Sequence, residues 1–307
     1  MGKIRVGTCS WTDPTLVGSG RFYPDSAHSA EDRLRYYASQ FNLVEVDSSY
    51  YSLPSERTSE LWVQRSGEAF TFDVKAFRLF TLHPTPQQAL PKELTDKLGP
   101  ELTEKPNLYY RDLPFPVIDD LWERFERALL PLDSSGKLGV VLFQFPPYVY
   151  PGSSALEHIL LCKERLPQYQ LAIEFRNSMW LSERHRADTF TFLRENGLAF
   201  VAVDEPQGFK SSVLPIAEAT AEIGLVRFHG RNAGTWEKKG ISAVERFNYL
   251  YNEDELKEWV DSMAQLSGQT RELHVLFNNC HEDKAVVNAR QMSFLLRLHT
   301  PSGMERE

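Results

Sequence analysis

Charged side chains that could carry out acid/base chemistry recur, two residues apart, near the ends of several apolar segments of this 307-residue chain. The pairs are Glu45 with Asp47, Glu174 with Arg176, and Arg227 with His229. Residues two apart in a strand share a face, so the members of each pair are expected to point the same way. Histidine titrates near neutral pH, and a glutamate beside an arginine stays ionised. We therefore predict that Glu174 and His229 form the acid/base pair, with Glu45 or Asp47 as a second carboxylate.

Basic, amide and aromatic side chains in the same places predict a binding site for a small anionic molecule. Arginine can clamp a carboxylate or phosphate through two parallel hydrogen bonds, and an aromatic face can stack on a planar or CH-rich ligand. The predicted binding residues are Lys75, Arg176, Arg227, Arg231, Asn278, Asn279, Trp11 and Tyr50. A hydrolase-type or lyase-type reaction fits these residues, and the substrate stays open.

Two other interpretations use the same residues. Glu45, Lys75 and Arg227 can form an internal layer of ion pairs that fixes strand register without catalysis, because a buried charge must be paired. Alternatively, the site can bind a metabolite, a nucleic-acid end or a partner protein without turnover. Two opposed carboxylates also suit glycoside hydrolysis, where their separation sets the stereochemical outcome.

Metal binding has little support in the sequence. No H-x-H, H-E-x-x-H or clustered Cys/His string occurs, although His83, His229 and His281 could converge with Glu174 and Asp204. We predict no metal site, and the cofactor stays open. The three cysteines, Cys9, Cys162 and Cys280, have no C-x-x-C spacing and are expected to be free thiols.

The elements that must position these side chains are eight short apolar segments separated by helix-like stretches. Most of them are apolar at nearly every position, as strands of a parallel sheet covered on both faces are. We predict strands at 4–9, 43–47, 70–75, 139–145, 171–175, 198–204, 224–229 and 273–278. This alternation predicts a TIM-type (β/α)8 barrel, in which strand ends and the loops after them form the active-site mouth. A doubly wound open sheet is the alternative fold, but no G-x-G-x-x-G follows the first strand.

Capping residues and apolar spacing predict helices in five places. They begin near Ser29, Ser55, Ser182, Asn252 and Glu282. Residues 77–119 interrupt the regular pattern with seven prolines and the string Tyr109-Tyr110-Arg111. Such a stretch is expected to form an ordered flap or packing appendage within one 1–307 barrel domain, because prolines and aromatic residues suit a flexible linker poorly. Residues 230–251 predict a smaller flap.

Composition limits the class of protein. The net charge of −8, from 34 basic and 42 acidic residues, argues against nonspecific nucleic-acid binding, which needs a basic surface. No apolar stretch approaches the roughly 20 residues that cross a bilayer, and no signal peptide precedes the first predicted strand. We therefore expect a cytoplasmic globular protein without a membrane partner. Its oligomeric state stays open.

Seven local strings together resemble the DUF72 (YecE-like) family. They are VGTCSW at 6–11, VEVDSSYYSLP at 44–54, FDVKA at 72–76, LFQFPP at 142–147, AIEFRNSMW at 172–180, VRFHGR at 226–231 and FNN at 277–279. The resemblance spans nearly the whole chain and implies a TIM barrel, but it implies no established reaction. Asp47 stands where the family pattern leads us to expect Asn, and residues 77–119 exceed the corresponding family region. Specificity is expected to differ from that of relatives if the ligand touches either place.

Overall fold

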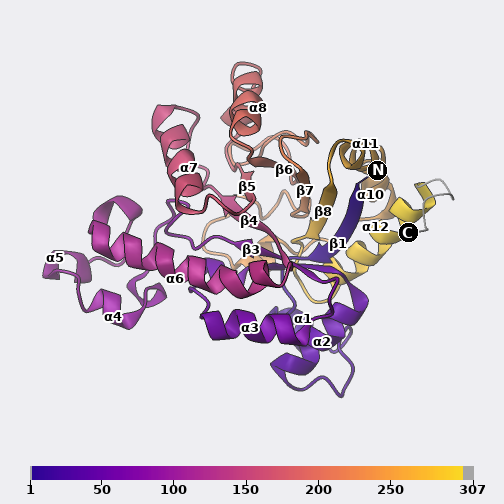
Figure 1. Ribbon diagram of the computed structural model, residues 1–307. Coiled ribbons are helices and arrows are strands. Elements are labelled where there is room, and N and C mark those ends of the chain that lie inside the picture. The colour runs from indigo at the N-terminus through magenta and orange to yellow at the C-terminus, as the bar shows by residue number, and fades with distance from the viewer. Residues whose placement is uncertain (1, 300–307) are drawn as a thin grey trace.

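The computed structural model describes residues 2–299 and contains a closed barrel of eight parallel strands, each hydrogen-bonded to the next, with β8 returning to β1. The strands are β1 (Lys3–Thr8), β2 (Leu43–Val46), β3 (Thr71–Lys75), β4 (Leu138–Gln144), β5 (Leu171–Glu174), β6 (Ala199–Asp204), β7 (Ile223–Phe228) and β8 (Glu272–Phe277). Helices surround this barrel (Figure 1). The fold is therefore the TIM-type (β/α)8 barrel that the strand pattern predicts.

Most connections between strands contain helices. The α-helices before β5 are α1 (Pro14–Ser19), α2 (Ala30–Gln40), α3 (Glu56–Arg65), α4 (Lys92–Thr95), α5 (Pro100–Thr103), α6 (Phe115–Ser134) and α7 (Ser153–Arg165). Those after β5 are α8 (Arg186–Glu195), α9 (Ala243–Arg246), α10 (Glu253–Lys257), α11 (Val260–Gln269) and α12 (Lys284–His299). Short 3-10 turns are η1 (Ser48–Tyr50), η2 (Gln87–Ala89), η3 (Tyr110–Asp112) and η4 (Ser178–Leu181). Within residues 2–299, none of the helices is long and apolar enough to cross a bilayer.

Local capping explains where several helices begin. Ser29 and Asp32 form a reciprocal capping box at the start of α2, and the Ser55 side chain caps α3. The helix expected from Ser182 begins four residues later, at Arg186, because Ser182 ends the 3-10 turn η4 and residues 183–185 form a further turn. The helix that Asn252 caps is divided between α10 and α11.

The segment after β3 is ordered and packs on α6. Its apolar side chains Leu90, Leu94, Leu98 and Leu102 belong to the same buried cluster as the residues of α6. Figure 1 shows α4 and α5 beside α6, at the end of the molecule opposite α12. Helix α6 begins at Phe115, inside the stretch expected to be irregular, so the irregular part ends at Pro114.

The inside of the barrel alternates between polar and apolar layers. Near the amino-terminal ends of the strands, His274 bonds to Asp73 at 2.9 Å and approaches Glu272, which pairs with Arg5 at 2.7 Å. Above this floor, Leu43 and Leu276 form a small buried cluster with Cys9 that is separate from the main core. The next polar layer lies at the carboxyl ends of the strands, where TIM barrels place their active sites.

Candidate functional site

Arg227 is the centre of a fully buried ion-pair layer at the carboxyl end of the barrel. Its guanidinium donates to Glu174 through Nη1 and to Glu45 through Nη2, the latter at 2.7 Å. All three side chains have zero exposure. Desolvation opposes the charge of Arg227, but the two carboxylates raise its pKa above the ordinary value. Arg227 therefore has the environment of a structural ion pair, the alternative that the sequence left open. The two carboxylates engage Nη1 and Nη2, whereas Nε has no hydrogen-bond partner among the described residues.

Glu174 on β5 is saturated with hydrogen-bond donors. One carboxylate oxygen, Oε1, accepts from Gln144 at 2.6 Å, from His229 at 3.0 Å and from Arg176 at 3.3 Å. The other oxygen, Oε2, accepts from Arg227. Burial alone would raise the pKa of Glu174, but Arg227 and His229 hold it well below its usual range. Such a carboxylate is a weak base at neutral pH.

Both ring nitrogens of His229 are already engaged. Nε2 lies 3.0 Å from Glu174 Oε1, and Nδ1 lies 2.9 Å from the side-chain amide of Asn278. The neutral tautomer that satisfies both contacts carries its proton on Nε2 and accepts from Asn278 through Nδ1. Burial lowers the pKa of His229 to about 3, although Glu174 opposes this. The ring is also covered by Trp236 and Phe247 from the 230–251 loop.

Lys75 is a cation at the rim of this layer without a carboxylate partner among the described residues. Its ammonium donates to the neutral side-chain carbonyl of Gln144 at 3.0 Å and lies 4.7 Å from the centre of the Tyr50 ring. Burial, together with the charge of Arg227, lowers the pKa of Lys75. Two of its three ammonium protons remain for a ligand.

Arg176 is the second cation at the rim, and it lies between two glutamates. Its Nη1 donates to Glu174, and its Nη2 lies 3.5 Å from Glu205 Oε2. The guanidinium packs 4.7 Å from the centre of the Trp236 ring, and its Nε has no hydrogen-bond partner among residues 2–299. The side chain is 13% exposed, so it can be reached from the mouth, unlike Arg227.

Glu205, which directly follows β6, was missed from the sequence. Its Oε1 accepts from the Val213 amide at 2.8 Å, whereas its buried Oε2 has no hydrogen bond among the described residues. Burial raises the pKa of Glu205 to about 7, against the opposing charge of Arg176. The available signal is its place directly after the strand, next to Asp204.

Asp47 at the end of β2 is a second carboxylate with a raised pKa. Burial is the main cause and the neighbouring charge of Glu45 adds to it, so the pKa of Asp47 reaches about 6. Its side chain is partly exposed, whereas Glu45, two residues earlier, is completely buried. Since β2 and β6 are four strands apart in an eight-stranded barrel, Asp47 and Glu205 follow strands on opposite sides.

Three predicted binding residues lie away from this cluster. Trp11 is buried against Trp62 of α3, with ring centres 5.7 Å apart. Asn279 donates to the Tyr249 carbonyl and to Asn288 of α12, both at 2.9 Å. Both side chains therefore serve packing between the barrel and its helices.

Arg231 is the third of these residues. It clamps Asp204 through Nε at 3.0 Å and Nη2 at 2.7 Å, and it also pairs with Glu258. Asp204 further accepts from Tyr251 at 2.6 Å and from Trp259 at 2.7 Å. This network ties the ends of β6 and β7 to the following helices, which leaves Arg231 occupied. The remaining predicted residues belong to the cluster: Arg176 and Arg227 contact its glutamates, Asn278 contacts His229, and Lys75 lies over the Tyr50 ring.

The cysteines and acidic groups of residues 2–299 do not assemble a metal site. No group of three or more His, Cys, Asp or Glu side chains in this part of the chain is arranged to hold a metal ion. All three cysteines are free, and burial raises the pKa of Cys9 well above the ordinary value, with Glu45 adding to the shift. Cys9 therefore remains a thiol that contacts Arg227 and Glu45 at 3.5 Å.

Comparison with known proteins gives a consistent family match. The family described as "Protein of unknown function DUF72" matches residues 5–306. The UPF0759 protein YunF of Bacillus subtilis (strain 168) is 32% identical over 298 residues, covering 95% of this chain and 94% of that protein.

Two solved structures of DUF72 proteins are similar along their whole length. The protein of Enterococcus faecalis V583 has a TM-score of 0.77 at 26% identity, covering 96% of this chain and 95% of its own. The protein of Thermotoga maritima MSB8 has a TM-score of 0.74 at 29% identity, covering 96% of this chain and 99% of its own.

Proposed function

The chain belongs to the DUF72 family, and we propose that it is an enzyme acting on a small anionic substrate by acid/base chemistry at the carboxyl-terminal mouth of its barrel. One observation carries this proposal. The polar residues divide into a fully buried layer around Arg227 and a partly exposed rim that holds Lys75 and Arg176. A layer that only fixed the strands would not need cations with spare donors above it.

The two rim cations are suited to bind an anion. Lys75 uses one hydrogen bond on a neutral amide, and the Arg176 side chain, which is 13% exposed, makes a single hydrogen bond within residues 2–299, to Glu174. Lys75 ends β3 and Arg176 follows β5, so a ligand centred on the mouth would be reached by both. Hydrogen bonds between charged groups are about twice as strong as neutral ones, which favours a carboxylate or phosphate here.

The proton transfers in this proposal are assigned to Glu205 and Asp47, replacing the pair Glu174 and His229 expected from the sequence. The hydrogen-bonding atoms of Glu174 and His229 are already engaged with each other and with their neighbours. Glu205, whose buried carboxyl has a pKa near 7 and lies 3.5 Å from Arg176, is assigned as the proton donor. Asp47, with a pKa near 6, is more often ionised and is assigned as the proton acceptor. Glu174 then acts as a positioning residue that orients Arg176.

A noncatalytic binding protein is the second candidate, and the saturation of Glu174 favours it. A carboxylate that accepts from four donors holds its neighbours rigidly and exchanges protons poorly. In that case the rim binds its anion without converting it. Binding and turnover therefore have to be measured separately.

Binding is tested by calorimetric titration with inorganic phosphate. Lys75→Ala and Arg176→Gln are each expected to weaken binding about tenfold, the equivalent of about 1.4 kcal/mol. Lys97→Ala is the charge-matched control, because Lys97 is exposed on the segment after β3. Equal affinity in all four proteins would contradict anion binding at the rim.

Turnover is tested by incubating the protein with a mixture of anionic metabolites from cell extract and measuring which are consumed by mass spectrometry. The unmodified protein is expected to consume at least one, and Glu205→Gln to consume it more slowly by a factor of about 100 or more, the range of general acid catalysis. Retention of a metabolite without consumption would support the binding protein instead.

A further inference from the structure

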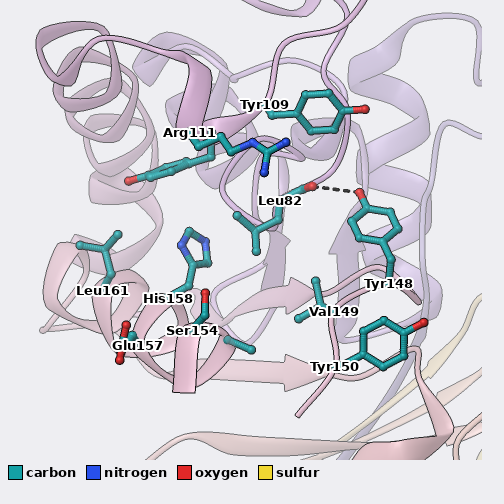
Figure 2. A pocket seen from close by; sticks show the side chains of 12 residues that line it. Leu82, Tyr109, Arg111, Tyr148, Val149, Tyr150, Ser154, Glu157, His158 and Leu161 are labelled. Carbon is teal, nitrogen blue, oxygen red and sulfur yellow. Dashed lines mark hydrogen bonds between the residues drawn. The ribbon is translucent and has the colours of Figure 1, made fainter. Parts of the chain in front are cut away.

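A hollow of about 870 Å³ lies outside the barrel mouth, between the segment after β3 and the start of α7. Figure 2 shows its wall formed by Leu82, by Tyr109 and Arg111, by the loop 148–150 and by the face of α7 that carries His158. Neither of the rim cations, Lys75 and Arg176, lines it, and the buried Glu205 does not line it either. Its volume is within the range of about 300–1,000 Å³ found for small-molecule sites.

Three exposed tyrosines give this pocket an aromatic lining. Tyr109, Tyr148 and Tyr150 are 40%, 52% and 57% exposed. The Tyr148 hydroxyl donates to the Leu82 carbonyl at 2.9 Å, which links the two sides of the pocket and orients that ring (Figure 2). Exposed tyrosines gathered at one hollow suit a flat ligand, because their rings present apolar faces and their hydroxyls present polar edges.

His158 provides a hydrogen-bond acceptor at the base of the pocket. Its Nε2 lies 2.8 Å from the Phe80 carbonyl, and a carbonyl only accepts, so the ring proton must be on Nε2. Burial lowers the pKa of His158, which keeps the ring neutral, and its edge-on contact with Tyr110 holds its orientation. Nδ1 is therefore an acceptor with no protein donor among residues 2–299.

Arg111 provides a positive charge at the opposite wall. It is exposed and has no ion pair or hydrogen bond within the described part of the chain. In Figure 2 its guanidinium extends over Leu82 into the space between Tyr109 and His158. An unpaired guanidinium beside aromatic rings is suited to a phosphate or carboxylate carried by an aromatic ligand.

We propose that this pocket is a second ligand site, for a planar heteroaromatic molecule that carries one anionic group, with a nucleoside 5′-monophosphate as its representative. The flat ring stacks on Tyr148 and Tyr150, an exocyclic amino N–H of the base donates to His158 Nδ1, and the phosphate binds Arg111. Glu157, on the α7 wall, accepts from sugar hydroxyls. This site is independent of the anion proposed at the barrel mouth.

The test is a titration of the full chain with AMP, followed by calorimetry and by tyrosine fluorescence. Adenosine, which lacks the phosphate, and ribose 5-phosphate, which lacks the base, are titrated in parallel. The test variants are Arg111→Gln and Tyr150→Ala, whose side chains are exposed and therefore contribute little to the buried core. Arg184→Gln is the control, because Arg184 is also exposed and has no ion pair among residues 2–299.

AMP is expected to bind at least about tenfold more tightly than either fragment. Arg111→Gln and Tyr150→Ala are each expected to weaken AMP binding about fivefold to tenfold, whereas Arg184→Gln is expected to leave it unchanged. The proposal is overturned if no heat is released at AMP concentrations up to about 5 mM. It is also overturned if ribose 5-phosphate binds as tightly as AMP, or if Lys75→Ala removes binding and Arg111→Gln does not, since the ligand would then occupy the barrel mouth.

Discussion

Replacing Arg227 with methionine tests how the buried layer is held together. Methionine approximates the length of the arginine stem but cannot neutralise the two carboxylates that Arg227 joins, Glu174 and Glu45. All three side chains are inaccessible to water, so the carboxylates cannot regain their solvation. Removing one partner of a buried ion pair costs about 3–5 kcal/mol, and this guanidinium serves two partners. We therefore expect the free energy of unfolding to fall by about 4 kcal/mol at neutral pH.

The loss is expected to depend on pH with a definite sign. In the unmodified protein, the pKa of Glu174 is lower folded than unfolded, so its stabilisation is present above the unfolded pKa of about 4.3 and is lost as the pH falls. Without Arg227, burial dominates and raises the pKa of Glu174. The variant therefore takes up a proton on folding, and its deficit is larger at about pH 8 than at about pH 5.

The assay is urea unfolding followed by tryptophan fluorescence at both pH values. Arg184→Met is the control, since it removes the same charge from an exposed position. A deficit below about 1 kcal/mol that is equal at both pH values would refute the assigned role of Arg227, because it would mean that the two carboxylates do not depend on it.

Three further predictions concern other buried groups. Burial opposes the charge of His274, but Asp73 raises its pKa to about 9, so the stabilisation that this ion pair gives is complete below about pH 6.5 and is lost as the pH rises through 9. In urea unfolding, His274→Gln should remove this decline in stability. The same pH dependence of stability in both proteins would refute the prediction. Gly139→Ala places a Cβ 2.2 Å from Asp73 Oδ1 and should lower the free energy of unfolding by about 1–3 kcal/mol, measured by thermal unfolding. Gly152→Ala is the control, because a Cβ there meets nothing within 4 Å. Equal melting temperatures for the two variants would be inconsistent with this packing. Glu205→Gln should abolish a protonated-carboxyl infrared band that titrates near pH 7, and a wild-type spectrum without that band would exclude the assignment.

The sequence predicted the strands well because each is a continuous apolar run between polar segments. Every predicted strand lies within one residue of the observed bounds at both ends. Helices were harder to predict. Neither α6 nor α7 was among the predicted helices, and α6 begins directly after Pro114, within a proline-rich stretch that obscured its apolar face. The start of α8 was misplaced because Ser182 belongs to a turn that packs before the helix begins.

The sequence predicted which residues gather at the site, but not which of them are buried and fully hydrogen-bonded. Period-two spacing correctly brought Glu174, Arg227 and His229 together, because strand alternation fixes which side chains face inward. Spacing cannot tell how many donors reach Glu174, since these come from β4 and β7 and from the residues that follow β5 and β7. Alternation also ends with the strand, so it gave no reason to choose Glu205, which follows β6 and contacts Arg176.

Locating a bound anion by X-ray diffraction tests the proposed function most directly. Crystals soaked in tungstate, an analogue of phosphate, give an anomalous signal that places the anion without prior assumptions. We expect the strongest peak at the barrel mouth, within hydrogen-bonding distance of both Lys75 Nζ and the Arg176 guanidinium, and we expect it to disappear in Lys75→Ala crystals. Peaks confined to the outer helices, with none between these two side chains, would contradict the proposal.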